Sequence, residues 1–151
     1  MSSSPFHVDE SRPWFSEEAG WPEEVPKNVE FERMTLGQML ANTAERWPDR
    51  RAIYFLETSM TFRELARHVA SFATALHQLG LKKGDVVAML LPNSFQYVIA
   101  YYAAARLGCV ATGINPTYKP AEVEHQLETP GAKALICLDA LYEDVVAPIV
   151  D

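Results

Sequence analysis

Apolar and polar positions first alternate regularly at Thr35, and from there they predict a series of helices and strands. A capping-box pattern, Thr35-Leu-Gly-Gln38, opens a segment in which apolar residues recur every three or four positions. This amphipathic helix is predicted to end at Pro48. The run 52–56 then predicts a strand, and residues 57–59 predict a turn into a short partner strand around Met60.

The next segment carries the clearest helical pattern in the chain. A second capping box, Thr61-Phe-Arg-Glu64, opens an amphipathic helix, and Gly80 stands where a left-handed helix stop is expected. After a turn at residues 82–85, positions 86–91 form an unbroken apolar run of strand length. Such runs are typical of a strand buried on both faces of a parallel sheet.

The third helix is predicted to be enclosed by other elements. Asn93-Ser-Phe-Gln96 is expected to cap it, and Gly108 to stop it. Its surface is apolar almost all round, which favours a position between two layers. Four alanines would allow a neighbour to approach closely: Ala100, Ala103, Ala104 and Ala105. Beyond it we predict a strand at 109–114, a helix at 120–127, a strand at 134–138 and a helix from Leu141 to Asp151.

This order predicts an α/β fold for residues 35–151, with a three-layer, mostly parallel sheet and helices on both faces. Residues 1–34 differ because four prolines prevent a continuous helix, while large aromatic residues stand between them. We predict an extended N-terminal arm whose aromatic side chains dock on the body or on a neighbouring chain. The prolines are Pro5, Pro13, Pro22 and Pro26.

Composition and charge narrow the classes of function. The chain has 151 residues, 48% hydrophobic and 22% charged, which is globular composition. Its net charge is −7, so we expect no nucleic-acid partner. Most of this negative charge lies in the first 35 residues. The longest strongly apolar stretch, 97–105, is about half the ~20 residues that cross a bilayer. With no secretory signal, we expect a cytoplasmic protein without a transmembrane segment.

The common catalytic and phosphate-binding motifs do not occur in this sequence. The seven glycines have neither dinucleotide-binding nor P-loop spacing, and no G-x-S-x-G nucleophile motif is present. The scattered histidines suggest no metal site, and Cys109 and Cys137 are interpreted as buried, reduced thiols. Acidic pairs such as Glu143/Asp144 are interpreted as solvated surface.

Several ordered motifs resemble those of the adenylate-forming enzymes. Residues 60–65 (MTFREL) resemble the first core motif, and residues 106–116 (RLGCVATGINP) resemble the second. Residues 115–118 (NPTY), with Glu122 and the segment to Lys133, are similar to the fatty acyl-CoA synthetase branch. Three further segments also resemble the family: Gly80 to Ala88, Leu91-Pro-Asn93 and the bacterial long-chain leader Arg12-Pro-Trp14. Met60 and Phe62 depart conservatively from the first motif, and Lys119 replaces a hydroxyl residue.

The resemblance implies that this chain is the N-terminal portion of a bacterial long-chain fatty acid–CoA ligase. Such an enzyme uses ATP and Mg²⁺ to convert a fatty acid to an acyl-adenylate, and then transfers the acyl group to CoA. Its catalytic motifs come later in the chain, so no catalytic or metal-binding residue is assigned and the portion alone is expected to be inactive. Asn115 and Pro116 are the one candidate site, because α/β sites gather where strands end.

Two other interpretations stay open. The chain could be an independent α/β module that binds a nucleotide or an acyl ligand. It could also be an interaction subdomain, from this branch or from one with an aryl or other acyl substrate, whose arm builds a homodimer. Asn115-Pro116 also has a plainer interpretation, as a turn between a strand and a helix.

Overall fold

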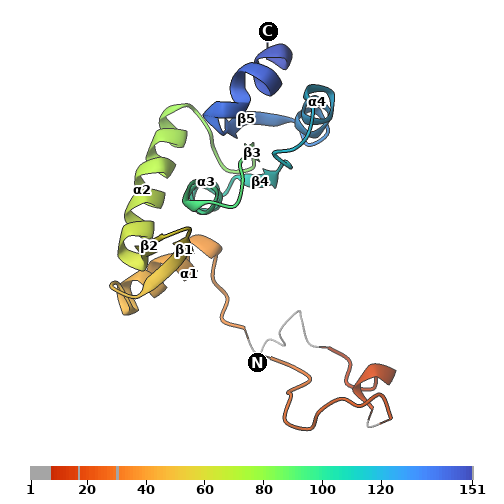
Figure 1. Ribbon diagram of the computed structural model, residues 1–151. Helices are drawn as coiled ribbons and strands as arrows, with labels where there is room; N and C mark the ends of the chain where they lie inside the picture. Colours follow the sequence, from red (N-terminus) through yellow and green to blue (C-terminus); the bar gives the residue numbers. More distant parts are fainter. Residues whose placement is uncertain (1–7, 17, 30, 151) are drawn as a thin grey trace. The chain divides into compact units, whose positions relative to one another are not determined.

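The computed structural model describes residues 8–16, 18–29 and 31–150 (Figure 1). The chain divides into two compact units, and the division falls between Arg33 and Met34. Pro5 and the predicted helix end at Asp151 lie outside the described residues.

A three-stranded parallel sheet forms the centre of the larger unit. Strand β3 (Val86–Leu90) lies between β4 (Val110–Gly113) and β5 (Ala132–Cys137), and both neighbours pair with it in parallel. Four of the five residues of β3 are buried. The apolar run therefore forms the doubly covered strand that its composition predicts.

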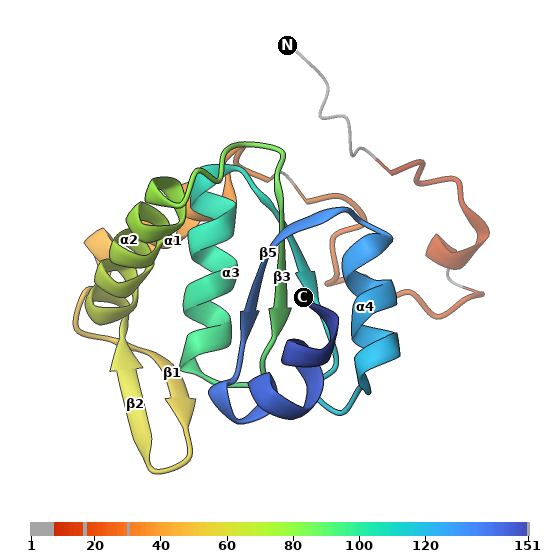
Figure 2. The same ribbon diagram turned by 90° about the horizontal axis from the view of Figure 1, so that it is seen from above.

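Helical segments cover both faces of this sheet. Val87 and Met89 of β3 belong to clusters on the face covered by α1 (Leu36–Arg46), α2 (Phe62–Gln78) and α3 (Phe95–Leu107). Ala88 and Leu90 point to the other face, where α4 (Pro120–Glu128) and the turns after β5 pack. Figure 2 shows α3 and α4 on opposite sides of the sheet. The predicted three-layer α/β architecture is confirmed.

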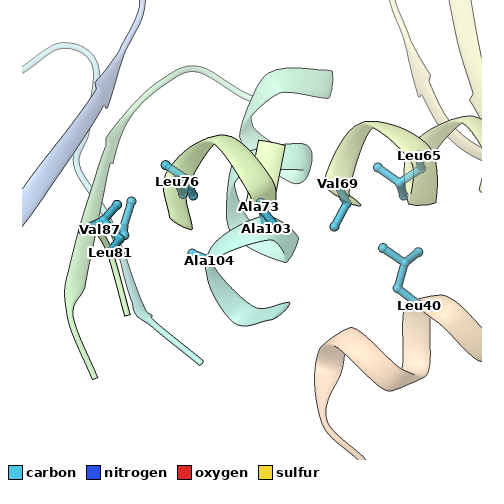
Figure 3. Packing of buried hydrophobic residues seen from close by; sticks show 9 residues of the cluster. All are labelled: Leu40, Leu65, Val69, Ala73, Leu76, Leu81, Val87, Ala103 and Ala104. Carbon is cyan, nitrogen blue, oxygen red and sulfur yellow. The ribbon is translucent and has the colours of Figure 1, made fainter. Parts of the chain in front are cut away.

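Helix α3 lies between the sheet and helices α1 and α2, as predicted. Its alanines make this possible: Ala100, Ala103 and Ala104 are buried. Figure 3 shows Ala103 close to Ala73 of α2 within the cluster that joins the three helices. The contact with α1 is also close, because a Cβ at Gly37 would lie only 3.3 Å from the Cα of Arg106.

The first two strands form a hairpin that is separate from the parallel sheet. Strand β1 (Arg51–Phe55) pairs antiparallel with β2 (Thr58–Thr61). The partner strand is confirmed, but the predicted bounds are wrong. The first strand ends at Phe55, so Leu56 belongs to the turn, and the second strand already begins at Thr58, which pairs with Phe55. Pairing these two residues leaves a two-residue loop, whose first residue, Leu56, has a positive φ of 52°.

Most of the helix ends predicted from the sequence agree with the structure, and two predictions about helices are wrong. Both predicted capping boxes form, with the Gln38 and Glu64 backbone N–H groups each donating to a threonine hydroxyl at 3.2 Å. Helix α3 is capped by Ser94 rather than Asn93, because the Ser94 hydroxyl accepts the Tyr97 N–H. The segment after β5 is a series of short helical turns, since Pro148 lacks the N–H that a continuous α-helix needs.

Aromatic side chains of the N-terminal unit pack on one another. After a short helical turn, Pro13–Phe15, the ring of Phe15 meets Trp21 edge to face with centroids 4.6 Å apart. The Trp21 indole N–H donates to the carbonyl of Val25 at 2.8 Å. Docking of the arm on another surface stays a prediction.

Replacing Leu56 by glycine is expected to stabilise the body by about 1 kcal/mol. A bulky residue at positive φ stores about 1–3 kcal/mol of strain, whereas the glycine loses about 1 kcal/mol through unfolded-state entropy. Leu56 is 87% exposed, so little packing is lost. Urea unfolding measures the difference. The matched change Leu79→Gly, at φ −74°, should instead lower stability, and a gain there equal to that of Leu56→Gly would contradict the strain argument.

Candidate functional site

Asn115 and Pro116, the residues proposed from sequence, follow β4 in a tight turn. The Asn115 Oδ1 accepts the Thr117 N–H at 3.0 Å and the Thr117 hydroxyl at 2.9 Å. The Asn115 carbonyl also accepts the Tyr118 N–H at 3.0 Å. These bonds shape the entry into α4. A ligand contact by Asn115-Pro116 stays a prediction.

A pocket of about 560 Å³ opens at the carboxyl ends of β3 and β5. Its walls are mostly apolar and include Phe55, Phe72, Ile99 and Ile136. The polar groups at the pocket come from Ser94, Gln96, Cys137 and Asp139, while Asn115 and Pro116 are not among its lining residues. Its size falls within the range of about 300–1,000 Å³ typical of small-molecule sites. Four separate segments form it, so no single sequence motif announces it.

The two cysteines are free and half-buried rather than fully buried as predicted. Cys109 precedes β4 and Cys137 ends β5. Burial, followed by the charge of Asp139, raises the pKa of Cys137. Burial, followed by the charge of Asp85, also raises the pKa of Cys109. The Cys137 thiol in the pocket is therefore held protonated, which disfavours nucleophilic chemistry.

Asp85 is the buried acidic residue that sequence reasoning passed over as part of a turn. It is only 7% exposed and lies just before β3, at the end of the strand opposite the pocket. Its Oδ1 accepts Lys133 Nζ at 2.6 Å, and its Oδ2 accepts the Lys82 backbone N–H at 2.9 Å. These bonds join the turn before β3 to β5, so Asp85 stabilises the sheet rather than serving the pocket.

The hydrogen bond from Lys133, and then that from Lys82, lowers the pKa of Asp85 below its ordinary value of 3.8. A lowered folded-state pKa contributes stability above the unfolded value, and this contribution is lost as the pH falls through the folded value. We therefore expect Asp85→Asn to be less stable than the native protein at pH 7, with the difference shrinking below pH 3.8. Urea unfolding across this range measures it. Asp144→Asn, at an exposed site, is the control; equal pH profiles for both variants would contradict the assignment.

The other titratable candidates lie on the surface. His68 and His77 on α2 and His125 on α4 are all exposed. Within the described ranges, no three His, Cys, Asp or Glu side chains are grouped so as to hold a metal. The helices described here also include none that is long and apolar enough to cross a membrane.

Residues 40–150 match the family model described as AMP-binding enzyme. This match begins within α1 and spans the hairpin, helices α2, α3 and α4, and the whole parallel sheet. The chain belongs to the AMP-binding enzyme family. The family predicted from the ordered motifs is confirmed.

Three comparisons place the chain within the AMP-binding family. It is 41% identical to the long-chain-fatty-acid–CoA ligase of Yersinia pestis over 118 residues, which are 77% of this chain and 21% of the ligase. The solved fatty acyl CoA synthetase of Mycobacterium tuberculosis is 34% identical, with a TM-score of 0.64 over 68% of this chain and 21% of that one. The anthranilate CoA ligase AuaEII, in complex with anthranoyl-AMP, is 26% identical, with a TM-score of 0.69 over 78% and 22%. The chain thus spans about a fifth of these relatives.

In this member of the AMP-binding enzyme family, both recognised motifs have structural roles. Thr61 and Glu64 of the first motif cap α2 by reciprocal hydrogen bonds. Gly108 of the second ends α3 at a φ of 74°, where a Cβ would lie 3.0 Å from Lys83. Motif residues in this part of the family fold therefore fix helix ends that set the position of the sheet.

Proposed function

We propose that this chain is the N-terminal portion of a cytoplasmic AMP-forming ligase that activates long-chain fatty acids and transfers them to CoA. The observation that carries the proposal is the 41% identity to a long-chain-fatty-acid–CoA ligase, within a family match over residues 40–150. The resemblance of residues 115–118 to the fatty acyl branch points the same way.

The proposed reaction has two balanced steps. A fatty acid carboxylate attacks the α-phosphorus of ATP and releases pyrophosphate. The CoA thiol then gives up its proton to solvent, attacks the acyl carbonyl as the thiolate and releases AMP. Both steps depend on positioning and on charge stabilisation at phosphate, which Mg²⁺ supplies. We propose that the Mg²⁺ ligands, like the other catalytic groups of the family, come from later in the longer protein. Asn115-Pro116 is our one candidate for contact with a substrate.

Pyrophosphate release from ATP tests the activity. A longer protein that begins with these residues is expected to release pyrophosphate when given a long-chain fatty acid, whereas the 151-residue chain alone is expected to release none. Activity of the short chain would overturn its assignment as an inactive portion. Faster turnover of benzoate or anthranilate by the longer protein would overturn the fatty acyl branch in favour of an aryl one.

We also propose that the N-terminal arm contributes to a homodimer. Trp14 and Phe31 are large aromatic side chains that stay exposed within the arm, and such groups are enriched at protein interfaces. Sedimentation of the chain with and without residues 1–34 tests this. Dimers that form only with the arm are the expected result, and identical monomers would contradict it.

A further inference from the structure

The pocket at the carboxyl ends of β3 and β5 has apolar walls from four separate elements. Phe55 ends β1, Phe72 lies on α2, Ile99 lies on α3 and Ile136 lies on β5. All four side chains are half-buried, so part of their apolar surface stays open to the pocket. Its volume of about 560 Å³ is that of a small-molecule site. Removal of apolar surface from water therefore favours a ligand with an apolar body.

The rim of this pocket carries a negative charge that no basic residue balances. Among the described residues that line the pocket, none is a lysine, arginine or histidine, and Asp139 is exposed. One carboxylate oxygen, Oδ1, accepts the Ala140 N–H at 2.9 Å, and no salt bridge in the described part of the chain holds Asp139. Its charge reaches into the pocket, because it adds to the effect of burial in raising the pKa of Cys137.

The first turn of α3 is the one positive feature at the pocket, and it is weaker than Asp139. A helix N-terminus carries about half a unit of positive charge. The Ser94 cap already takes up part of this turn, since its hydroxyl accepts the Tyr97 N–H at 3.3 Å and its carbonyl accepts the Val98 N–H at 3.4 Å. The full charge of an ionised carboxylate outweighs what is left. The rim therefore disfavours ligands that end in a carboxylate or a phosphate.

We propose that this pocket binds an apolar ligand that ends in a protonated amine. The apolar body would lie against Phe55, Phe72 and Ile136, and the ammonium group would donate hydrogen bonds to the Asp139 carboxylate. Charge complementarity favours this class over a fatty acid, ATP or CoA, each of which brings negative charge to an acidic rim. The inference goes beyond the proposed function and does not depend on it. Its test requires no turnover, so the two proposals fail separately.

Titration calorimetry of the 151-residue chain with three ligands that share a dodecyl tail tests the proposal. Dodecylamine is expected to bind most tightly, dodecanol more weakly and dodecanoate most weakly, all at concentrations below those that form micelles. The variant Asp139→Asn is expected to lose about fivefold in affinity for dodecylamine, which is the upper range for an exposed ion pair. Its affinity for dodecanol is expected to stay unchanged, because an alcohol carries no charge.

Two matched controls separate the pocket from the rest of the surface. Asp144→Asn removes the same charge at an exposed site that does not line the pocket, and it is expected to bind all three ligands as the native chain does. Gln96→Trp places a bulky ring at an exposed lining position and is expected to weaken dodecylamine and dodecanol alike, whereas Gln78→Trp, exposed at the end of α2, is expected to weaken neither. Urea unfolding of every variant confirms that the body still folds.

Three results would overturn the proposal. Dodecanoate that binds as tightly as dodecylamine would refute the preference for an amine. Equal losses in Asp139→Asn and Asp144→Asn would show that only net charge matters. Binding of the dodecyl ligands that survives Gln96→Trp unchanged, or no binding of dodecylamine to the native chain, would show that the pocket is not the site.

Discussion

Replacing Leu90 by alanine is expected to lower the free energy of unfolding of the body by about 2–5 kcal/mol. Leu90 ends the central strand β3 and is 0% exposed. Its cluster contains Ile114, Val123 and Val146, which come from three other segments, so removal of three carbon atoms leaves a cavity that no single neighbour can fill. A loss of this size is a large part of the 5–15 kcal/mol that stabilises an ordinary domain. Urea unfolding, followed by circular dichroism, measures it.

The matched control is Leu79→Ala, which removes the same atoms from a side chain that is 79% exposed. That change is expected to stay within about 0.5 kcal/mol of the native protein. If both variants keep the native slope of unfolding free energy against urea concentration, their unfolded state is the same as that of the native protein. If Leu90→Ala cost no more than its control, α4 would not cover the second face of the sheet, and the three-layer arrangement would be refuted.

Local chemistry explains which elements could be predicted from sequence. The capping boxes at Thr35 and Thr61 satisfy backbone donors within four residues, so their geometry depends on nothing distant. Strand β3 could be predicted because burial on both faces leaves every position apolar. The glycine stops at Gly80 and Gly108 are likewise local, since each relieves the strain of a positive φ. These local features allowed the order of elements along the chain to be predicted.

Features that depend on distant partners could not be predicted in the same way. Asp85 resembles any turn residue until β5 places Lys133 beside it, 48 residues later in the chain. The pocket requires Phe55, Phe72 and Ile136 to meet, and those residues come from three different elements. The separation of the hairpin from the parallel sheet is also a tertiary outcome, because β1 pairs with β2 in preference to β3.

The family could be recognised without a catalytic residue because its motifs here stabilise the fold. A threonine–glutamate cap on α2 and a glycine at the end of α3 are needed whatever acid the enzyme activates. This explains why both a fatty acyl CoA synthetase and an anthranilate CoA ligase resemble the chain at similar TM-scores. The residues that line the pocket lie outside these two motifs. Differences between branches of the family are therefore expected there.

Replacing Ala104 by leucine is expected to destabilise the body by about 1–3 kcal/mol, and the reason is the position of α3 between two layers. Ala104 is fully buried in the cluster that includes Leu76 of α2 and Val87 of β3. A longer side chain has no direction in which to turn, because α2 lies on one side and the sheet on the other. Thermal unfolding is expected to show a clearly lower midpoint than that of the native protein.

The same replacement at Ala75 is the control for this prediction. Ala75 lies on the exposed side of α2, so leucine there adds a side chain to the surface without displacing a neighbour. It is expected to change stability by no more than about 0.5 kcal/mol. If Ala104→Leu were tolerated equally well, α3 could not be as closely packed as its alanines indicate. The double variant Leu76→Ala/Ala104→Leu tests the contact between α2 and α3 directly. It is expected to recover part of the stability that Ala104→Leu loses, but only if the two side chains meet.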